Sequence, residues 1–268
     1  AKEGSTFRGK LDFNFIRGDF DDRFSDNCGQ YISAAKHYLS YTQDRELLAE
    51  VLPVARGAMQ FYLTCLDGAS GLIDNRYLVG HFNSGTAATG VGICDGFWDA
   101  ISFPNVNLYA NLSFHQALVG MLYLEEMAEA CGVEVPAVTV LAGYYDTADG
   151  EGVTDRKMDY GFLMFNLQTV TDGIASAEQA EKIMEWVSGA REIEGDDSAG
   201  ADIYKYEFAP RFTTRHNATD GIWAVGQASH WEVGVRDGGA VMQTSYYDLT
   251  ARSRVLGADN AFVRLMGI

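Results

Sequence analysis

Residues 26–66 read DNCGQYISAAKHYLSYTQDRELLAEVLPVARGAMQFYLTCL, and this stretch decides the fold class of the chain. Apolar residues recur there with helical spacing, first over residues 26–42 and again over residues 45–66. Asp26 is placed to cap the first helix, and Pro53 is expected to kink or restart the second. Because so short a connection joins the two helices, the stretch predicts a helical hairpin.

The same helical spacing returns along the rest of the chain. The stretch DGASGLID at residues 67–74 is expected to stop the second helix and to begin a short extended piece. Further helices are predicted over residues 108–131, 160–174, 176–187 and 240–256. Gly132 is expected to end the first of these, and Ser176 with Gln179 forms a capping box for the third. Asp259 is expected to cap a last helix that the chain does not finish.

Two long segments separate the predicted helix pairs. Residues 71–104 and residues 204–239 are rich in polar and aromatic side chains without sustained periodicity, which is typical of functional loops. The apolar–polar alternation of half-buried strands is nearly absent from the chain. The sequence therefore predicts an all-α fold, and the alternation of helix pairs with loops favours a toroid in which loops at one rim build the site.

Composition limits the classes of partner. The chain has 268 residues, of which 47% are hydrophobic, and this is enough for a sizeable core. Its net charge of -17 argues against nucleic acid and against anionic membrane surfaces, because both require clustered Lys and Arg. No apolar run approaches the ~20 residues of a membrane span. No nucleic-acid or membrane partner is therefore predicted, and the cellular compartment stays open.

Neither a metal nor a cofactor is predicted. The four cysteines are widely spaced without a C-x-x-C pair; they are Cys28, Cys65, Cys94 and Cys131. All but Cys94 fall within helical patterns, where burial as a free thiol is favoured over a disulfide or a nucleophile. The histidines show no zinc-ligand spacing, and the glycine-rich stretches lack the lysine of a phosphate-binding loop.

Three loops before predicted helices carry more acids than helix capping needs. The acids are Asp19, Asp21, Asp22 and Asp26 in the first loop, Asp95 and Asp99 in the second, and Glu232 and Asp237 in the third. One short polar residue suffices at a helix N-terminus. Aromatic residues accompany the acids: Phe97, Trp98, Tyr204, Tyr206, Trp223 and Trp231. Since a carboxyl pair across a cleft is what glycoside cleavage needs, the loops favour a carbohydrate site, and the alternative is capping plus solvated charge.

Four stretches of the chain carry a resemblance to a known family. They are SDNCGQYISAAKHYLSYTQDRELLAEVLPVARGAMQFYLTCLDGASGLID (25–74), DYGFLMFNLQTVTDGIASAEQAEKIMEWVSG (159–189), YEFAPRFTTRHN (206–217) and VRDGGAVMQTSYYDLTARSRVLGADNAF (235–262). In this order they resemble segments of a bacterial branch of the six-hairpin glycosidases, whose (α/α)6 barrels include glucoamylases, trehalases, rhamnosidases and maltose phosphorylases. The resemblance implies an (α/α)6-toroid-like fold and a carbohydrate substrate.

The resemblance also implies roles for individual residues. WDAISFPNVNLYAN (98–111) is similar to the segment that holds the general acid in these barrels, which implies Asp99 as the acid. VRDGG (235–239) is similar to a loop across the cleft, which implies Asp237 as the base, with Glu232 in reserve. The substrate-binding residues are predicted to be Asp95, Phe97, Trp98, Tyr206, Arg211, His230, Trp231 and Asn27. Inversion of configuration then requires the two carboxyl groups to lie about 6.5–9.5 Å apart.

The predicted helices are too few for a complete barrel. Six hairpins require twelve helices, whereas about seven or eight are expected here from periodicity. Residues 1–268 are therefore expected to form a single α/α-toroid domain that is part of a larger barrel, with an oligomer or additional domains supplying further wall. The leading prediction is an inverting glycoside hydrolase. The alternatives are a carbohydrate-binding or inactive scaffold protein with a partial barrel, a glycoside phosphorylase of the same fold and, third, an unrelated helical interaction protein.

Overall fold

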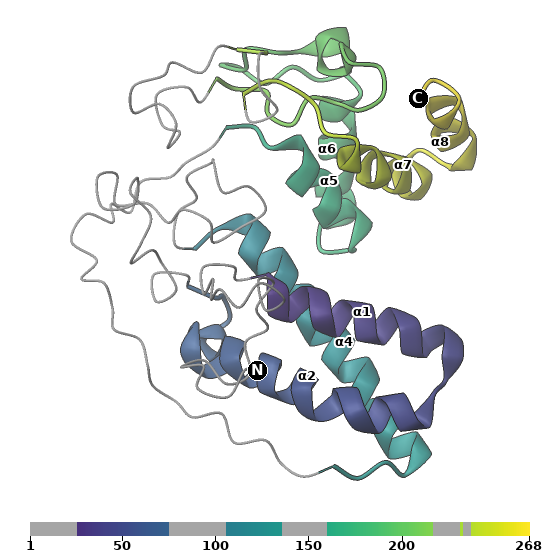
Figure 1. The fold of residues 1–268 in the computed structure, drawn as a ribbon. Coiled ribbons are helices and arrows are strands. Elements are labelled where there is room, and N and C mark those ends of the chain that lie inside the picture. The colour runs from purple at the N-terminus through teal and green to yellow at the C-terminus, as the bar shows by residue number, and fades with distance from the viewer. Residues whose placement is uncertain (1–25, 75–105, 136–159, 217–230, 233–236) are drawn as a thin grey trace, which may run out of the picture. The chain divides into compact units, whose positions relative to one another are not determined.

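Figure 1 shows the computed structural model, which describes residues 26–74, 106–135, 160–216, 231–232 and 237–268. The chain divides into two compact units, Ala1–Arg156 and Lys157–Ile268. Most of the described residues are helical, and they form α-helices, short 3-10 helices and isolated β-bridges but no strand. The prediction of an all-α fold is thereby confirmed.

The first unit is built on three long helices that lie side by side in Figure 1: α1 (Asn27–Thr42), α2 (Arg45–Cys65) and α4 (Leu108–Cys131). The predicted hairpin of α1 and α2 is confirmed. Gln43 ends α1 in the left-handed conformation, and the Asp44 side chain caps α2 by accepting from the Leu47 amide at 3.0 Å. The helices share one apolar core, which includes Ile32, Leu39, Leu48, Leu52, Phe61, Leu66, Phe114 and Leu124. Its burial is the main source of stability for this unit.

Two glycines let α1 and α4 approach closely. A Cβ on Gly29 would lie 2.1 Å from the Ser113 hydroxyl and 2.5 Å from the Ser113 carbonyl oxygen. On α4, a Cβ on Gly120 would lie 2.8 Å from a methyl group of Ile32. The two backbones therefore pack at a distance that only a missing side chain allows.

Some local predictions in the first unit need correction. The Asp26 side chain does not cap α1; it accepts instead from the Tyr109 hydroxyl at 2.6 Å and from the Gln30 side chain. Helix α2 continues through Pro53, so the helix does not restart there. Beyond α2, Asp67 adopts a left-handed conformation and precedes the 3-10 helix η2 (Gly68–Ser70), while the extended piece expected after residue 74 lies outside the described residues. Gly132 ends α4 as predicted.

The second unit contains α5 (Leu163–Thr171), α6 (Ala177–Val187), η4 (Gly200–Tyr204), α7 (Gln243–Val255) and α8 (Ala258–Leu265). The predicted capping box of Ser176 and Gln179 is confirmed at the start of α6. The core of the unit is formed by Leu163, Leu167, Val170, Ala180, Met184, Val187, Ile203 and Ala251. Asp259 lies in the first turn of α8 rather than at its cap, and the helix ends at Leu265, so both predictions for the last helix are wrong.

A buried ionic network fixes α8 to α7. The carboxylate of Asp248, which has no exposed surface, accepts from Arg252 at 2.8 Å and from Arg264 at 3.0 Å. The Tyr204 hydroxyl donates to the same carboxylate at 2.8 Å, and burial is the main cause that raises the pKa of Tyr204. Since α8 has no buried residue of its own, these charged hydrogen bonds hold it in place.

Candidate functional site

Backbone pairing in the second unit brings the predicted site residues together. Arg211 forms an isolated antiparallel bridge with Ala240, and Phe162 forms one with Thr213. The Glu232 amide donates to the Asp237 carbonyl oxygen at 2.8 Å, which joins these two residues. These contacts place Trp231, Glu232 and Asp237 beside Arg211 in one cluster, although the residues lie far apart in the sequence.

Arg211 is the centre of this cluster. Its side chain has no exposed surface, and each guanidinium nitrogen donates to a protein oxygen. Nε donates to the Asp202 carbonyl oxygen at 3.1 Å, and Nη1 donates to the Gly238 carbonyl oxygen. Nη2 contacts the Asp202 carboxylate at 2.9 Å and the Glu232 carboxylate at 2.7 Å. A buried guanidinium with this set of partners is held rigidly and has little capacity left to bind an anionic ligand.

Glu232 and Asp202 both carry solvent-accessible carboxylates in the cluster, and Glu232 is the one that the sequence predicted. Its side chain is 30% exposed; Oε1 accepts from Arg211 and Oε2 accepts from Lys205. Lys205 and then Arg211 hold the pKa of this carboxyl below its ordinary value of 4.5, because both hydrogen bonds favour the charged form. Glu232 is therefore ionised at neutral pH and within reach of solvent.

Two aromatic rings flank the guanidinium. The Arg211 carbon Cζ lies 5.3 Å from the ring centre of Trp231 and 5.5 Å from that of Tyr206, distances that suit cation–π contacts. The Tyr206 hydroxyl donates to the Glu232 carbonyl oxygen at 3.1 Å. Gly238, at φ +80°, faces the Trp231 ring so closely that a Cβ would lie 2.8 Å from three ring atoms. Both rings are half-buried, so part of each remains accessible to a ligand.

Asp237 is paired with His216, a residue for which no role was predicted. The Asp237 side chain has no exposed surface, and its Oδ2 lies 2.6 Å from Nδ1 of His216. The His216 side chain is 43% exposed and packs edge-on against Trp231, with ring centres 6.1 Å apart. No sequence spacing signals this pair, because the contact depends on where the segment at His216 lies against the turn at Asp237.

The other predicted site residues are not brought into this cluster by the described structure. Asn27 begins α1 in the first unit and is 6% exposed, and its buried Nδ2 has no hydrogen-bond partner among the described residues. The remaining predicted residues fall outside the described part of the chain; they are Asp95, Phe97, Trp98, Asp99 and His230. Their assigned roles stay predictions.

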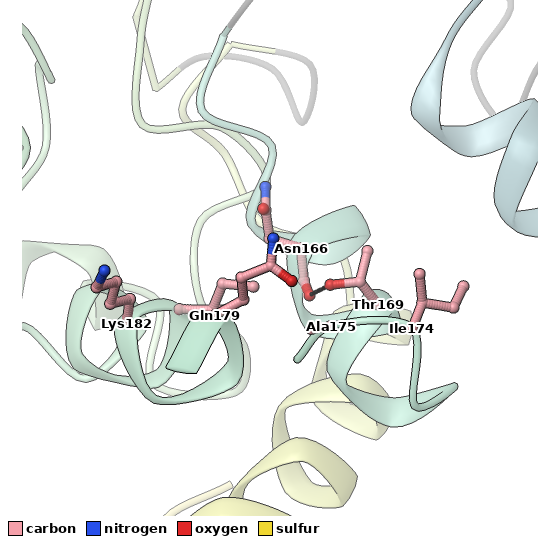
Figure 2. Close-up of a pocket in the computed structure, with 7 residues that line it drawn as sticks. Asn166, Thr169, Ile174, Ala175, Gln179 and Lys182 are labelled. Atoms are coloured by element: carbon pink, nitrogen blue, oxygen red, sulfur yellow. Dashed lines mark hydrogen bonds between the residues drawn. The ribbon is translucent and has the colours of Figure 1, made fainter. Parts of the chain in front are cut away.

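A separate hollow of about 360 Å³ lies between α5 and α6 (Figure 2). Its lining comprises Asn166, Thr169, Ile174, Ala175, Gln179, Lys182 and Ile183. The polar side chains there serve the helices themselves: Thr169 donates to the Asn166 carbonyl oxygen at 2.7 Å, and Gln179 belongs to the capping box. Lys182 pairs with Glu178. The hollow is therefore a crevice of the hairpin whose polar groups are already engaged.

The described residues hold neither a metal-ligand cluster nor a membrane-spanning helix. No three or more His, Cys, Asp or Glu side chains there gather as metal ligands would, and no helix is long and apolar enough to cross a membrane. Cys28 is a buried thiol, as predicted, whereas the thiol of Cys131 is half-buried. The Cys65 side chain and Cys94 lie outside the described part of the chain.

Comparison of the chain with models of protein families, with curated proteins and with solved structures finds no match. The likeness to six-hairpin glycosidases therefore rests on the four sequence stretches quoted above. The described geometry bears on function through one feature, the cluster of charged and aromatic side chains around Arg211.

Proposed function

We propose that this protein is a glycoside hydrolase that cleaves an oligosaccharide or a glycoconjugate with inversion, and that its helices belong to an α/α toroid. The supporting observation is the meeting of three carboxylates, two aromatic rings and a fixed guanidinium in one cluster. Glycoside cleavage requires a carboxylate that activates water and a surface that holds the sugar ring. Glu232 supplies the first, and Trp231 with Tyr206 supplies the second.

Glu232 suits the role of base better than Asp237. A general base must reach the water molecule that it activates, and Asp237 has no exposed surface. Glu232 is 30% exposed, and its lowered pKa keeps it in the charged form that accepts a proton. We therefore assign the base to Glu232, the residue that the sequence placed in reserve.

Asp99 keeps its assignment as the general acid. The segment around it resembles the acid-bearing segment of the six-hairpin glycosidases, and Phe97 and Trp98 are its immediate neighbours. Apolar neighbours favour the protonated form of a carboxyl group, which a general acid requires.

The charge of the cluster favours a neutral substrate. The nitrogens of Arg211 are occupied by protein oxygens, and Lys205 is paired with Glu232. An anionic group would find no free partner on Arg211, whereas a sugar needs only a ring surface and hydrogen bonds to its hydroxyl groups. A neutral oligosaccharide is thus the substrate class that fits.

The test is hydrolysis of 4-nitrophenyl glycosides and of malto-, cello- and xylo-oligosaccharides, with and without inorganic phosphate. Asp99→Asn and Glu232→Gln should each lower kcat about 10²–10⁴-fold, because each removes an acid–base group. Glu178→Gln is the matched control, since Glu178 is an exposed carboxylate paired with a lysine in the same unit. The anomeric form of the first product, read by ¹H NMR, should be opposite to that of the substrate. Full activity of Glu232→Gln, or a retained configuration, would contradict the proposed mechanism.

A second candidate is a protein that binds carbohydrate without cleaving it. It is favoured by the cations on both oxygens of Glu232, which reduce the basicity of that carboxylate. Titration of the same oligosaccharides by calorimetry separates the two functions. Binding without turnover would favour this candidate, and turnover that requires phosphate would favour a phosphorylase.

A further inference from the structure

His216 presents Nδ1 of its ring to Asp237, and no group of the described part of the chain donates to the other ring nitrogen. Its Nδ1 lies 2.6 Å from Oδ2 of the buried Asp237 carboxylate. Because a carboxylate only accepts hydrogen bonds, the neutral ring must carry its proton on Nδ1. Its Nε2 then holds a lone pair, and within the described residues no group donates to it.

Two further contacts fix the ring in this orientation. The backbone amide of His216 donates to the Asp197 carboxylate at 2.6 Å, which anchors the main chain. The ring edge packs against Trp231 at 6.1 Å between ring centres. With 43% of its side chain exposed and its ring against that of Trp231, His216 is accessible to a molecule that binds at Trp231.

We infer that His216 contacts the substrate, accepting on Nε2 a hydrogen bond from a sugar hydroxyl, and that Asp237 is the positioning residue that holds this tautomer. The inference rests on the proposed function and deepens it. A hydroxyl group fits because it can donate to the lone pair while its sugar ring lies against Trp231. Asp237 is too buried to act as a base. Under this assignment its role is to orient His216.

The alternative to substrate contact is a purely structural tie between two segments. The two possibilities respond differently to a pair of substitutions. His216→Asn keeps an amide near the position of Nδ1, facing Asp237, but has no atom at the position of Nε2. His216→Gln places an amide near the position of Nε2 and loses the contact with Asp237.

The experiment measures KM and Kd for the oligosaccharide that the wild type cleaves best. Substrate contact predicts that KM and Kd rise about tenfold in His216→Asn, the loss of one hydrogen bond, and rise less in His216→Gln. A structural tie predicts the reverse order, with His216→Gln the more damaged variant. His37→Asn is the control, since His37 is an exposed helix residue of the first unit, and it should leave both constants unchanged.

The tautomer of His216 is read independently from the ring ¹⁵N shifts of the wild-type protein at neutral pH. The Nδ1–H form supports the inference, and a dominant Nε2–H form overturns it. Unchanged KM and Kd in His216→Asn also overturn the inference about His216. In that case the wild type still cleaves the oligosaccharide, so the proposed function stands. If the wild type neither binds nor cleaves any sugar, both the proposed function and the sugar contact are wrong. This outcome differs from unchanged constants in His216→Asn, because there the wild type is active.

Discussion

Replacing Arg211 by methionine removes the cation that holds the second unit's site together. Removing one partner of a buried ion pair costs about 3–5 kcal/mol in typical cases. Here Asp202 and Glu232 are 47% and 30% exposed, so water can solvate both carboxylates once the cation is gone. The backbone carbonyl oxygens of Asp202 and Gly238 lose a charged donor. Since methionine fills most of the space, we expect a loss near the lower limit, about 3 kcal/mol.

The loss is measured by urea unfolding followed through tryptophan fluorescence. Trp186, Trp223 and Trp231 lie in the unit Lys157–Ile268, so the signal reports mainly on this unit. With a slope of about 1–3 kcal/mol per M urea, the midpoint should fall by about 1–3 M. Arg211→Lys should fall in between, because an ammonium group cannot serve all the oxygens that the guanidinium serves.

The control is Arg191→Met, which removes an exposed arginine from the same unit. Its effect should stay within about 0.5 kcal/mol. If Arg211→Met unfolds at the same urea concentration as this control, the buried guanidinium does not hold the unit together, and the argument from its hydrogen bonds is wrong.

Two further predictions concern acid stability and helix packing. Because Lys205 and Arg211 depress the pKa of Glu232 in the folded state, its contribution to stability is present above 4.5 and is lost as the pH falls through the depressed pKa. The urea midpoint of the wild type should therefore approach that of Glu232→Gln between about pH 6 and about pH 3, and a constant difference would contradict this. Gly29→Ala should destabilise the first unit by about 3 kcal/mol, since its Cβ would lie 2.1 Å from the Ser113 hydroxyl. A melting temperature equal to that of the wild type would show that α1 and α4 separate without cost.

Sequence periodicity predicted the helices because a helix face must bury apolar side chains every three to four residues. Periodicity did not predict where α5 and α7 begin. Residues 160–162 and 240–242 continue the helical pattern but lie outside the helices, since Phe162 and Ala240 form bridges with Thr213 and Arg211. Backbone pairing with a distant segment competes with local helix formation, and its outcome depends on tertiary contacts.

The candidate site, too, was predicted from the sequence only in part. Acids clustered with aromatic side chains pointed to Glu232, Asp237 and Trp231, because these residue types are needed together for sugar chemistry. Which of the two acids is accessible to solvent was not readable from the sequence. The tertiary structure separates them, since the Asp237 side chain is fully enclosed and that of Glu232 is not.

The sequence by itself determined the helical class of this protein, the α1–α2 hairpin and the capping box of α6, because these features depend on residues within a few positions of one another. Only the tertiary structure decided the contacts of Arg211 and the pairing of His216 with Asp237. Those contacts join segments separated by many residues, and the free energy that brings them together comes from burial and charge pairing across the whole unit, which no local pattern records.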